Sequence, residues 1–418
     1  MSSEPDLVAS TAALPAAQAA DLLALVADDA PVSWVRDGEG LVGWGTAASV
    51  RTSGPTRFAD AAKWWAELVA RSRVDDAIGV PGSGLVAFGS FAFADGTPAA
   101  PGEAVLQVPA VVVGRRGDQA WVTTIGPEST LGPEGTPPWT PAPAPVAPAP
   151  QVSFADDAAD AERWQGVVAE AVARIRRGEL AKVVLARAVH ATSGVPIDVR
   201  APLARLAEAY PMCWTFHVDG LFGATPELLV RREHGRVTSR VLAGTLPATG
   251  DSPSLAAALA GSGKDLEEHA YAVRSVADAL EPHCVSLDVP EEPFVLHLPN
   301  VVHLATDVAG TVRDGVTALQ LAEALHPSAA VGGTPRPDAV ALIAEIEGLD
   351  RGRYAGPVGW VDAHGDGEWG IALRSAELSP DRRSVRLFAG CGIVADSDPA
   401  TELVESRAKL VPVRDALA

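Results

Sequence analysis

Apolar and polar positions along the chain follow two periodicities, and each predicts one kind of element. Apolar residues that recur every three or four positions indicate amphipathic helices, whereas alternating or short continuous apolar runs indicate strands. Helices are expected at residues 60–73, 158–177, 264–280, 318–324, 337–347 and 399–416. Strands are expected at residues 84–93, 110–116, 182–191, 214–218, 228–233, 236–242, 356–362, 369–378 and 384–389. The strands fall in groups with hairpin-like spacing that helices interrupt, which favours an α+β fold with mainly antiparallel sheets.

Residues 137–150 read PPWTPAPAPVAPAP and form a low-complexity stretch. Alternating proline and alanine favour an extended, semi-rigid backbone. The stretch separates an N-terminal part, residues 1–136, from a C-terminal part, residues 151–418. It is either a linker between two domains or a surface excursion of one fold, and the pattern leaves both open.

Composition narrows the class of protein. The chain has 418 residues, of which 47% are hydrophobic, and this is enough for a substantial core. No apolar run reaches the length of about 18 residues that a membrane span needs. The N-terminus lacks the basic start of a secretory signal, so we expect a cytoplasmic protein. The three cysteines are far apart in sequence and form no disulfide framework or CxxC metal site, so we expect packed, reduced thiols.

The formal net charge of −20 argues against nucleic acid as a partner, because binding phosphates requires a basic face. An acidic surface also keeps proteins soluble, so the charge needs no functional explanation. Any site for an anionic ligand must nevertheless supply local cations against this overall field.

The last predicted helix has an unusual polar face. Asp398 and Pro399 form a suitable N-cap and first helical position. Glu402, Glu405 and Lys409 then follow at spacings of three and four, which places them on one face. This face is either a solvated acidic surface with a Glu405–Lys409 pair or part of a site that holds a cation.

A second predicted helix carries a similar arrangement in the segment KDLEEH, residues 264–269. Asp265 and Glu268 are three residues apart, and Lys264 precedes Glu268 by four. Two such helices that face each other would offer carboxylates to Mg²⁺, which prefers oxygen ligands and needs only one or two of them from protein.

Two charged residues adjoin apolar strands. Lys182 shares a strand face with Val184 and Ala186, and it either extends to water or, if buried, has a lowered pKa that suits a general base. Glu227 precedes the run Leu228–Val230, and it is either exposed after a proline turn or desolvated and protonated near neutral pH.

Further candidates are glycine-rich segments and one arginine. Glycines beside small polar residues, at 243–245, 332–334 and 389–393, let backbone amides approach a carboxylate, although ordinary turns use the same residues. Arg374 alternates with Ala372 and Ala376 in the predicted strand. It is either a fork for a carboxylate or one partner of a cross-strand ion pair.

Seven ordered motifs together resemble the chorismate-utilising enzymes over most of residues 155–418. They are KVVLAR (182–187), GATPEL (223–228), AGTLP (243–247), KDLEEH (264–269), HPSAAVGGTP (326–335), YAGPVGW (354–360) and ESRAK (405–409). The resemblance implies one large α+β domain, residues 1–418, in which two antiparallel sheets pack face to face with helices outside. Residues 155–418 are then the chorismate-binding core, 1–136 a less characteristic part, and 137–150 a surface loop.

The resemblance also implies the ligands of a magnesium ion. Carried over by position, Glu268 and Glu405 would bind Mg²⁺, and Asp265 and Glu402 would help through water. The ion would hold the ring carboxylate of chorismate, with Lys409 beside it.

The rest of the implied site binds and transforms the substrate. Arg374 and Tyr354 would hold the pyruvyl carboxylate, with amide contacts from the backbone at Gly244, Thr245 and Gly390. His303 matches an active-site histidine near the leaving group. Arg374, Lys409 and the magnesium ion would supply the local positive charge that an anionic ligand needs in a protein of net charge −20.

Members of the family differ in the nucleophile. Lys182 matches the lysine that activates water in isochorismate and salicylate synthases, where anthranilate synthases carry glutamine. Ala243 stands where aminodeoxychorismate synthases carry a lysine that attacks the ring. These two differences disfavour both ammonia-using classes, the anthranilate synthases and the aminodeoxychorismate synthases. The resemblance implies an isomerase that makes isochorismate: Lys182 activates water for attack at C2, and Glu227 protonates the departing C4 hydroxyl.

Two alternatives stay open. A salicylate synthase would go on to eliminate pyruvate, but Ala330 matches the small residue of isochorismate synthases where salicylate synthases tend to carry threonine. A non-catalytic chorismate-binding protein is disfavoured by the intact set of acid–base residues. We expect a monomer without an amidotransferase subunit, and the product could enter menaquinone or siderophore synthesis.

Overall fold

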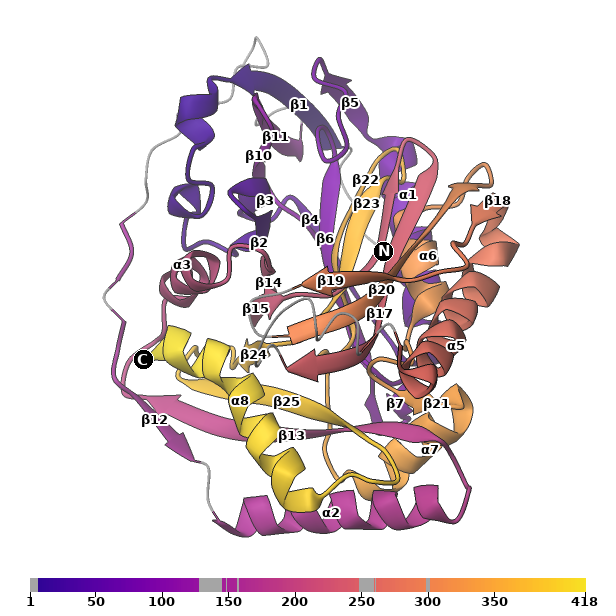
Figure 1. Cartoon of the computed structure of the whole chain (residues 1–418). Helices are drawn as coiled ribbons and strands as arrows, with labels where there is room; N and C mark the ends of the chain where they lie inside the picture. Colours follow the sequence, from indigo (N-terminus) through magenta and orange to yellow (C-terminus); the bar gives the residue numbers. More distant parts are fainter. Residues whose placement is uncertain are drawn as a thin grey trace.

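The computed structural model describes residues 7–127, 145–147, 149–155, 158–247, 259, 261–297 and 301–418, with backbone alone at a few positions inside helices and strands. Two large sheets dominate this part of the chain (Figure 1). Every ladder between its strands is antiparallel except that of β1 with β5.

The first sheet has 13 strands. In order across the sheet they are β12 (Val152–Ala155), β13 (Lys182–Ser193), β25 (Ser384–Ile393), β24 (Ser375–Leu378), β15 (Leu221–Thr225), β14 (Trp214–Val218), β2 (Val32–Arg36), β3 (Glu39–Trp44), β10 (Val111–Arg116), β11 (Gln119–Pro127), β1 (Leu7–Leu14) and β5 (Arg73–Asp76), with β21 (Gly333–Thr334) paired to β13.

The second sheet has 10 strands. In order they are β18 (Cys284–Asp288), β20 (Val301–Val312), β17 (Arg236–Pro247), β16 (Leu228–Glu233), β23 (Gly367–Ile371), β22 (Pro357–Asp362), β6 (Val86–Phe91), β9 (Glu103–Val108) and β4 (Ala48–Ser53), with β19 (Phe294–His297) paired to β20. A small hairpin joins β7 (Gly96–Thr97) to β8 (Ala100–Pro101). Strands from both sides of residues 137–150 contribute to both sheets, since β2 pairs with β14 and β6 pairs with β22.

Helices cover both sheets from outside (Figure 1). Three pack over the first sheet: α2 (Ala158–Arg176), α3 (Arg200–Ala209) and α8 (Pro399–Leu417). Three pack over the second: α1 (Arg57–Arg71), α5 (Gly263–Leu280) and α6 (Ala318–Leu325), while α7 (Arg336–Ile346) packs against β13 and β21. Short 3-10 turns occupy Ala16–Ala19, Leu23–Leu25, Gly54–Thr56 and Glu281–His283. The predicted α+β fold with two antiparallel sheets and outer helices is confirmed.

The core lies between the sheets. Its largest fully buried side chains include Trp34 and Trp121 from the first sheet and Trp360 and Trp369 from the second. The buried carboxylate of Glu368 accepts hydrogen bonds from the indole nitrogens of Trp34, at 2.7 Å, and of Trp214, at 3.2 Å. This pairing satisfies indole groups that would otherwise be buried without a partner, and it ties one sheet to the other.

Local sequence explains where two of the helices begin. The Asp398 side chain accepts the Thr401 amide at the start of α8, as the N-cap prediction requires, and Pro399 follows at the first helical position. Thr317 and Gln320 form a capping box at the start of α6. Helix α3, which no predicted element covered, buries Leu203 and Leu206.

Three strand predictions were wrong. Residues 369–378 are not one strand: β23 ends at Ile371 in the second sheet, and β24 begins at Ser375 in the first. The strand predicted to stop at residue 389 continues to Ile393, and the strand predicted to stop at residue 242 continues to Pro247. Residues 390, 392 and 244 therefore lie in strands and not in loops. These errors arise because strand pairing is a long-range contact that alternation does not encode.

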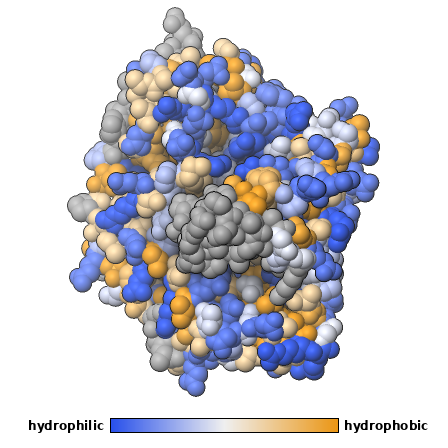
Figure 2. All heavy atoms as spheres, viewed as in Figure 1, coloured by the Kyte–Doolittle hydropathy of each residue, from blue (hydrophilic) through white to orange (hydrophobic). Residues whose placement is uncertain are grey.

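Polar residues are mixed with apolar ones in the helices and on the visible surface of the described residues. Among the described residues, we find no helix whose length and hydropathy would let it cross a bilayer. On the face shown in Figure 2, hydrophilic residues cover much of the coloured surface and apolar groups are interspersed among them. This mixture is consistent with the acidic composition.

Candidate active site

Two of the places where the chain passes from one sheet to the other are neighbours in space. One crossing, from β15 to β16, contains Glu227, and the other, from β23 to β24, contains Arg374. The Glu227 carbonyl accepts the Ile371 amide at 3.1 Å, and the Arg374 carbonyl accepts the Ala224 amide at 3.3 Å. The backbone of each crossing is therefore tied to the other, which holds the two charged residues at one position between the sheets.

Glu227 lies in an environment that favours its neutral form. Its side chain is half-buried, and burial raises the pKa of the carboxyl to about 7. The nearby positive charges of Lys182 and then Lys409 act in the opposite direction and lower the pKa in part. The carboxyl therefore lies within electrostatic range of both lysines, and close to neutral pH it can act as an acid.

Lys182 reaches the same region from β13. It begins the strand, is half-buried, and pairs in register with Thr334 of β21. Its side chain passes over Gly392, where a Cβ would lie 3.1 Å from the lysine Cε and 3.7 Å from Nζ. A side chain at position 392 would therefore crowd the end of the lysine side chain. Gly333 is needed too, because its φ is +134° and a Cβ there would lie 2.3 Å from the Lys182 carbonyl oxygen.

The acidic face predicted for the last helix forms on α8. Glu405 is exposed and pairs with Lys409 at 2.6 Å, and the Lys409 Nζ also donates to the Gly390 carbonyl at 2.9 Å. Glu402 is buried, and its Oε1 accepts a hydrogen bond from Ser397 Oγ at 2.7 Å. Burial raises the pKa of Glu402, the bond from Ser397 opposes this rise, and the charge of Glu405 adds to it.

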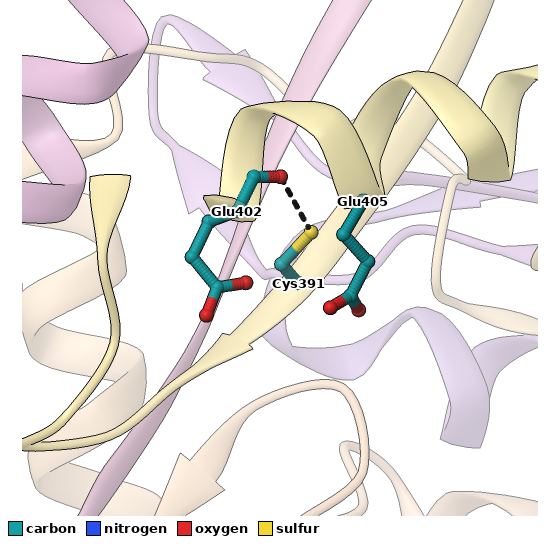
Figure 3. A group of neighbouring side chains, drawn as sticks. All are labelled: Cys391, Glu402 and Glu405. Carbon is teal, nitrogen blue, oxygen red and sulfur yellow. Dashed lines mark hydrogen bonds between the residues drawn. The ribbon is translucent and has the colours of Figure 1, made fainter. Parts of the chain in front are cut away.

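A third donor lies between these carboxylates. The Cys391 thiol and the carboxylates of Glu402 and Glu405 place one donor atom each within 4.8 Å of one another (Figure 3). The Cys391 Sγ donates to the Glu402 backbone carbonyl at 3.4 Å, and burial raises the pKa of this thiol to about 12. Glu402 Oε2 is buried and has no hydrogen-bond partner among the described residues. Two carboxylates that converge around a buried oxygen of this kind fit a hard divalent cation.

Tyr354 and Arg374 lie near each other. Tyr354 is buried, stacks on Phe388 with ring centroids 4.9 Å apart, and points its hydroxyl to within 3.1 Å of the Cβ position of Gly390. Burial raises the pKa of this phenol, and the positive charge of Arg374 is among the groups that lower it.

Arg374 differs from its predicted setting. Its φ is +48°, in the left-handed region, so it does not alternate with Ala372 and Ala376 along a strand. Among the residues that the structure describes, no carboxylate lies within ion-pair distance of its guanidinium. The cross-strand ion pair considered from sequence is therefore not formed there, and the half-buried cation remains available to an anion.

A buried ion pair holds the strand that carries Lys182. Beyond the short pairing with β21, the Glu347 carboxylate accepts the Ala186 amide at 2.7 Å, and Arg351 donates to the Val184 carbonyl at 2.7 Å. The two side chains pair with each other at 2.6 Å, and Arg351 also donates to the Val331 carbonyl at 3.1 Å. The pair thus forms the hydrogen bonds that a neighbouring strand would form at Val184 and Ala186. It also holds the turn that contains Val331.

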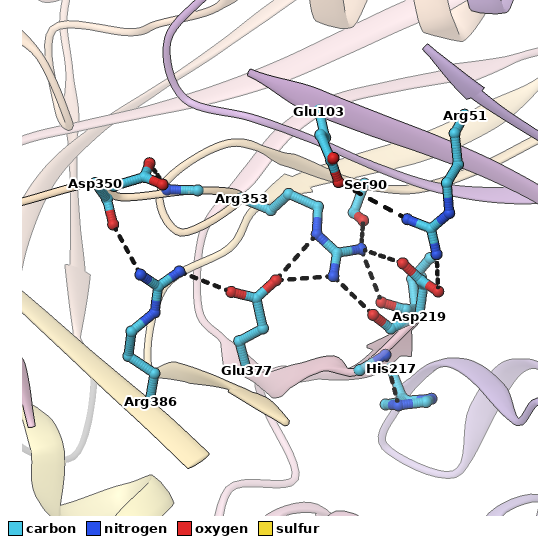
Figure 4. Close-up of polar contacts among 12 residues, drawn as sticks. Arg51, Ser90, Glu103, His217, Asp219, Asp350, Arg353, Glu377 and Arg386 are labelled. Carbon is cyan, nitrogen blue, oxygen red and sulfur yellow. Dashed lines mark hydrogen bonds and ion pairs between the residues drawn. The ribbon is translucent and has the colours of Figure 1, made fainter. Parts of the chain in front are cut away.

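A second polar network lies directly before Tyr354 (Figure 4). Arg353 pairs with Glu377 of β24 at 2.9 Å and donates to Ser90 Oγ of β6 at 2.8 Å, so it links the two sheets. It also pairs with Asp219 at 3.1 Å, and Arg386 pairs with the second oxygen of Glu377 at 2.9 Å. This network anchors the backbone from which the Tyr354 side chain extends.

The remaining predicted residues are less completely described. Ala330 is exposed in a turn whose Gly332 amide donates to the Ser328 carbonyl at 2.9 Å. The side chains of the other five lie outside the described residues, although their backbone belongs to α5, β17 and β20: Asp265, Glu268, Gly244, Thr245 and His303. The backbone pairs Thr245 with His303 beside a bulge in β17.

Sequence reasoning missed Cys391, Glu347 and Arg351. Cys391 was expected to be a packed thiol without a role, although its position in a glycine-rich segment just before the acidic helix was a signal. Glu347 and Arg351 are spaced four apart, but their partners on β13 lie far away in sequence and left no local pattern.

Solved structures share this two-sheet arrangement. The menaquinone-specific isochorismate synthase MenF of Escherichia coli matches with a TM-score of 0.78 and 26% identity, covering 99% of this chain and 95% of that one. Anthranilate synthase component I of Streptococcus pneumoniae matches with a TM-score of 0.67, covering 98% and 92%, and at 20% identity this likeness shows the fold alone. The fold and site thus define the class of α+β enzymes to which these synthases belong.

Sequence comparison identifies the family. The model of the chorismate binding enzyme family matches residues 3–418, so the chain belongs to this family and is an enzyme. A MenF protein of Mycobacterium tuberculosis is 46% identical over 256 residues, which are 57% of this chain and 68% of that protein. Isochorismate synthase DhbC of Bacillus subtilis is 43% identical over 263 residues, which are 59% of this chain and 66% of that protein. The predicted resemblance is confirmed.

Proposed function

We propose that this enzyme is an isomerase that converts chorismate to isochorismate in a magnesium-dependent reaction. The observation that carries the proposal is that Lys182 lies within electrostatic range of the Glu227 carboxyl, whose pKa is about 7. A base and an acid of this kind suit a reaction that deprotonates one oxygen and protonates another. The relatives named as isochorismate synthases support the same activity.

The charges of the site suit a dianion. Arg374 has no carboxylate partner among the described residues, and Lys409 lies on the α8 face beside Gly390. These cations supply local positive charge in a protein of net charge −20. In the proposed complex Arg374 and Tyr354 bind the pyruvyl carboxylate, and Lys409 lies beside the ring carboxylate.

The proposed reaction is an allylic displacement. Lys182, in its neutral form, accepts a proton from water as the water oxygen forms a bond to C2 of the ring. Both ring double bonds shift, from C1=C2 to C1=C6 and from C5=C6 to C4=C5, the C4–O bond breaks, and Glu227 donates its proton to the departing hydroxyl. One water is consumed and one is released, so the net change is an isomerisation. Positioning and electrostatic stabilisation would supply most of the rate.

The α8 carboxylates fit the magnesium ion that the family resemblance implies. Glu405 would bind it, Glu402 with its unpartnered buried oxygen would assist, and Glu268 and Asp265 of α5 complete the proposed set. When bound, the ion would neutralise the ring carboxylate of chorismate and hold it in place. His303 and the backbone at Gly244, Thr245 and Gly390 are proposed to contact the substrate.

The test is product analysis after mixing the full chain with chorismate and Mg²⁺. Isochorismate as the product is expected, whereas salicylate with pyruvate would identify a salicylate synthase and unchanged chorismate would contradict the proposal. Added ammonia should give no anthranilate, since we propose that the enzyme acts without an amidotransferase subunit.

Lys182→Met provides the matched test of the base. This variant should lose turnover by about 100-fold or more while still binding chorismate. Lys63→Met, which changes an exposed lysine of α1, serves as the control and should retain turnover. Activity that survives in Lys182→Met would remove this lysine from the mechanism.

A further inference from the structure

A thiol lies among the carboxylates proposed for magnesium. Donor atoms of Cys391, Glu402 and Glu405 lie within 4.8 Å of one another. Cys391 is buried in β25 and Glu402 is 9% exposed, whereas Glu405 is exposed and forms the solvent-facing side of the group. In Figure 3 the two carboxylate groups flank the Cys391 side chain. Together the group offers one sulfur and two carboxylates to a single ion.

The burial of the Glu402 carboxylate is a second observation that points to a bound cation. Its Oε1 accepts from Ser397 Oγ at 2.7 Å, but its Oε2 is buried without a hydrogen-bond partner among the described residues. A buried carboxylate oxygen without a partner costs free energy, and a cation would satisfy it. The bond from Cys391 Sγ to the Glu402 carbonyl, at 3.4 Å, keeps the sulfur against the helical turn that carries this oxygen.

The sulfur changes which metals the group prefers. Mg²⁺ is a hard cation that binds oxygen and leaves a thiol protonated. Zn²⁺ and softer cations such as Cd²⁺ bind thiolate together with carboxylate, and they deprotonate the coordinating thiol. A site with one thiolate and two carboxylates therefore discriminates in favour of these ions.

We propose that Cys391, Glu402 and Glu405 form a high-affinity site for Zn²⁺ and Cd²⁺, and that these ions inhibit the enzyme by displacing Mg²⁺. The inhibition rests on the proposed function, because it takes Glu402 and Glu405 as part of the magnesium site. On binding, the Cys391 S–H bond breaks, a sulfur–metal bond forms, and one proton passes to solvent. No electron is transferred.

The decisive measurement is a Cd²⁺ titration of the metal-free full chain without chorismate. The ultraviolet charge-transfer absorption from thiolate to cadmium should rise and saturate at one ion per chain, with release of one proton per ion. Cys391→Ser should abolish this absorption and weaken Cd²⁺ binding at least about tenfold by calorimetry. Serine keeps a similar size and can still donate to the Glu402 carbonyl.

Two further variants make the result specific. Cys284→Ser, which changes another buried cysteine in β18, should keep both the absorption and the affinity. Glu402→Gln should keep the absorption but weaken binding, and it provides a second test if Cys391→Ser does not fold. An absorption that survives Cys391→Ser, or Cd²⁺ binding without the absorption, would overturn the proposal.

Inhibition supplies a separate readout. At fixed Mg²⁺, Zn²⁺ should inhibit chorismate turnover, and the inhibitory concentration should rise at least about tenfold in Cys391→Ser but not in Cys284→Ser. A chain that does not turn over chorismate would contradict the proposed function, while the cadmium titration would still decide the metal site. Magnesium-dependent turnover without the charge-transfer absorption would overturn the metal site alone.

Discussion

Replacing Glu227 with glutamine should make the protein more stable at alkaline pH and inactive at every pH. The Glu227 pKa of about 7 is raised from 4.5, mainly because the carboxyl is desolvated between the sheets. A rise of this size corresponds to about 3 kcal/mol of unfavourable free energy for holding the ionised form in the folded state. Glutamine has the same shape and never ionises, so it avoids this cost.

The direction in which stability changes with pH follows from how many protons Glu227 binds in the folded and the unfolded protein. Between pH 4.5 and about 7 the folded protein binds more protons at this carboxyl than the unfolded chain does. The stability of the native protein therefore falls as pH rises through this window and stays lowered above it. The advantage of Glu227→Gln should be less than about 1 kcal/mol at pH 5 and about 3 kcal/mol at pH 8.

Thermal unfolding of both proteins at these two pH values checks the prediction. For a chain of 418 residues, the entropy of unfolding is on the order of 0.9 kcal/mol/K, so the variant should melt about 4 °C higher at pH 8 and about 1 °C higher at pH 5. Glu67→Gln, which changes an exposed glutamate of α1, is the matched control and should show no such gap. A difference between variant and native protein that is the same at both pH values would refute the reasoning.

Three further predictions concern the proposed magnesium ligand, the buried ion pair beside β13 and the arginine proposed to bind the substrate carboxylate. Glu405→Gln should raise the Mg²⁺ concentration for half-maximal turnover at least about tenfold, whereas Asp415→Asn on the same helix should not; equal responses would contradict the metal assignment. Arg351→Met should lower the free energy of unfolding by about 3–5 kcal/mol, because it leaves the Glu347 carboxylate buried without its cation, and Glu347→Gln in the same chain should recover much of the loss; denaturant titration measures both. Arg374→Gly should weaken chorismate binding about 10- to 100-fold by calorimetry with little change in melting temperature, and unchanged affinity would exclude Arg374 from the site.

The part of the site that could be predicted from sequence is the part with local geometry. Glu402, Glu405 and Lys409 share a face of α8 because helical spacing puts them there, and the Asp398 cap fixes where that helix begins. The fold class followed in the same way from strand grouping and hairpin spacing. Both depend on contacts between residues that are close in the chain.

The part that could not be predicted depends on long-range pairing. The alternation around Arg374 continues through the point where the chain leaves one sheet for the other, so nothing local marks the break at residues 372–374. Cys391 gains its carboxylate neighbours only because α8 packs on β25. Likewise, the role of Arg351 is visible only once its hydrogen bond to the Val184 carbonyl is known.

Both charged residues of the sheet crossings are held in states that their own chemistry disfavours. Glu227 is a carboxyl with a raised pKa, and Arg374 has a positive φ, which a residue with a Cβ rarely adopts. A folded protein tolerates such positions where the surrounding structure fixes them, and here the backbone hydrogen bonds from Ile371 to the Glu227 carbonyl and from Ala224 to the Arg374 carbonyl do so. Removing the charge at either crossing should therefore cost activity without lowering stability, whereas disrupting the supporting pair at Arg351 should cost both. This contrast separates the residues that act on the substrate from those that hold them in place.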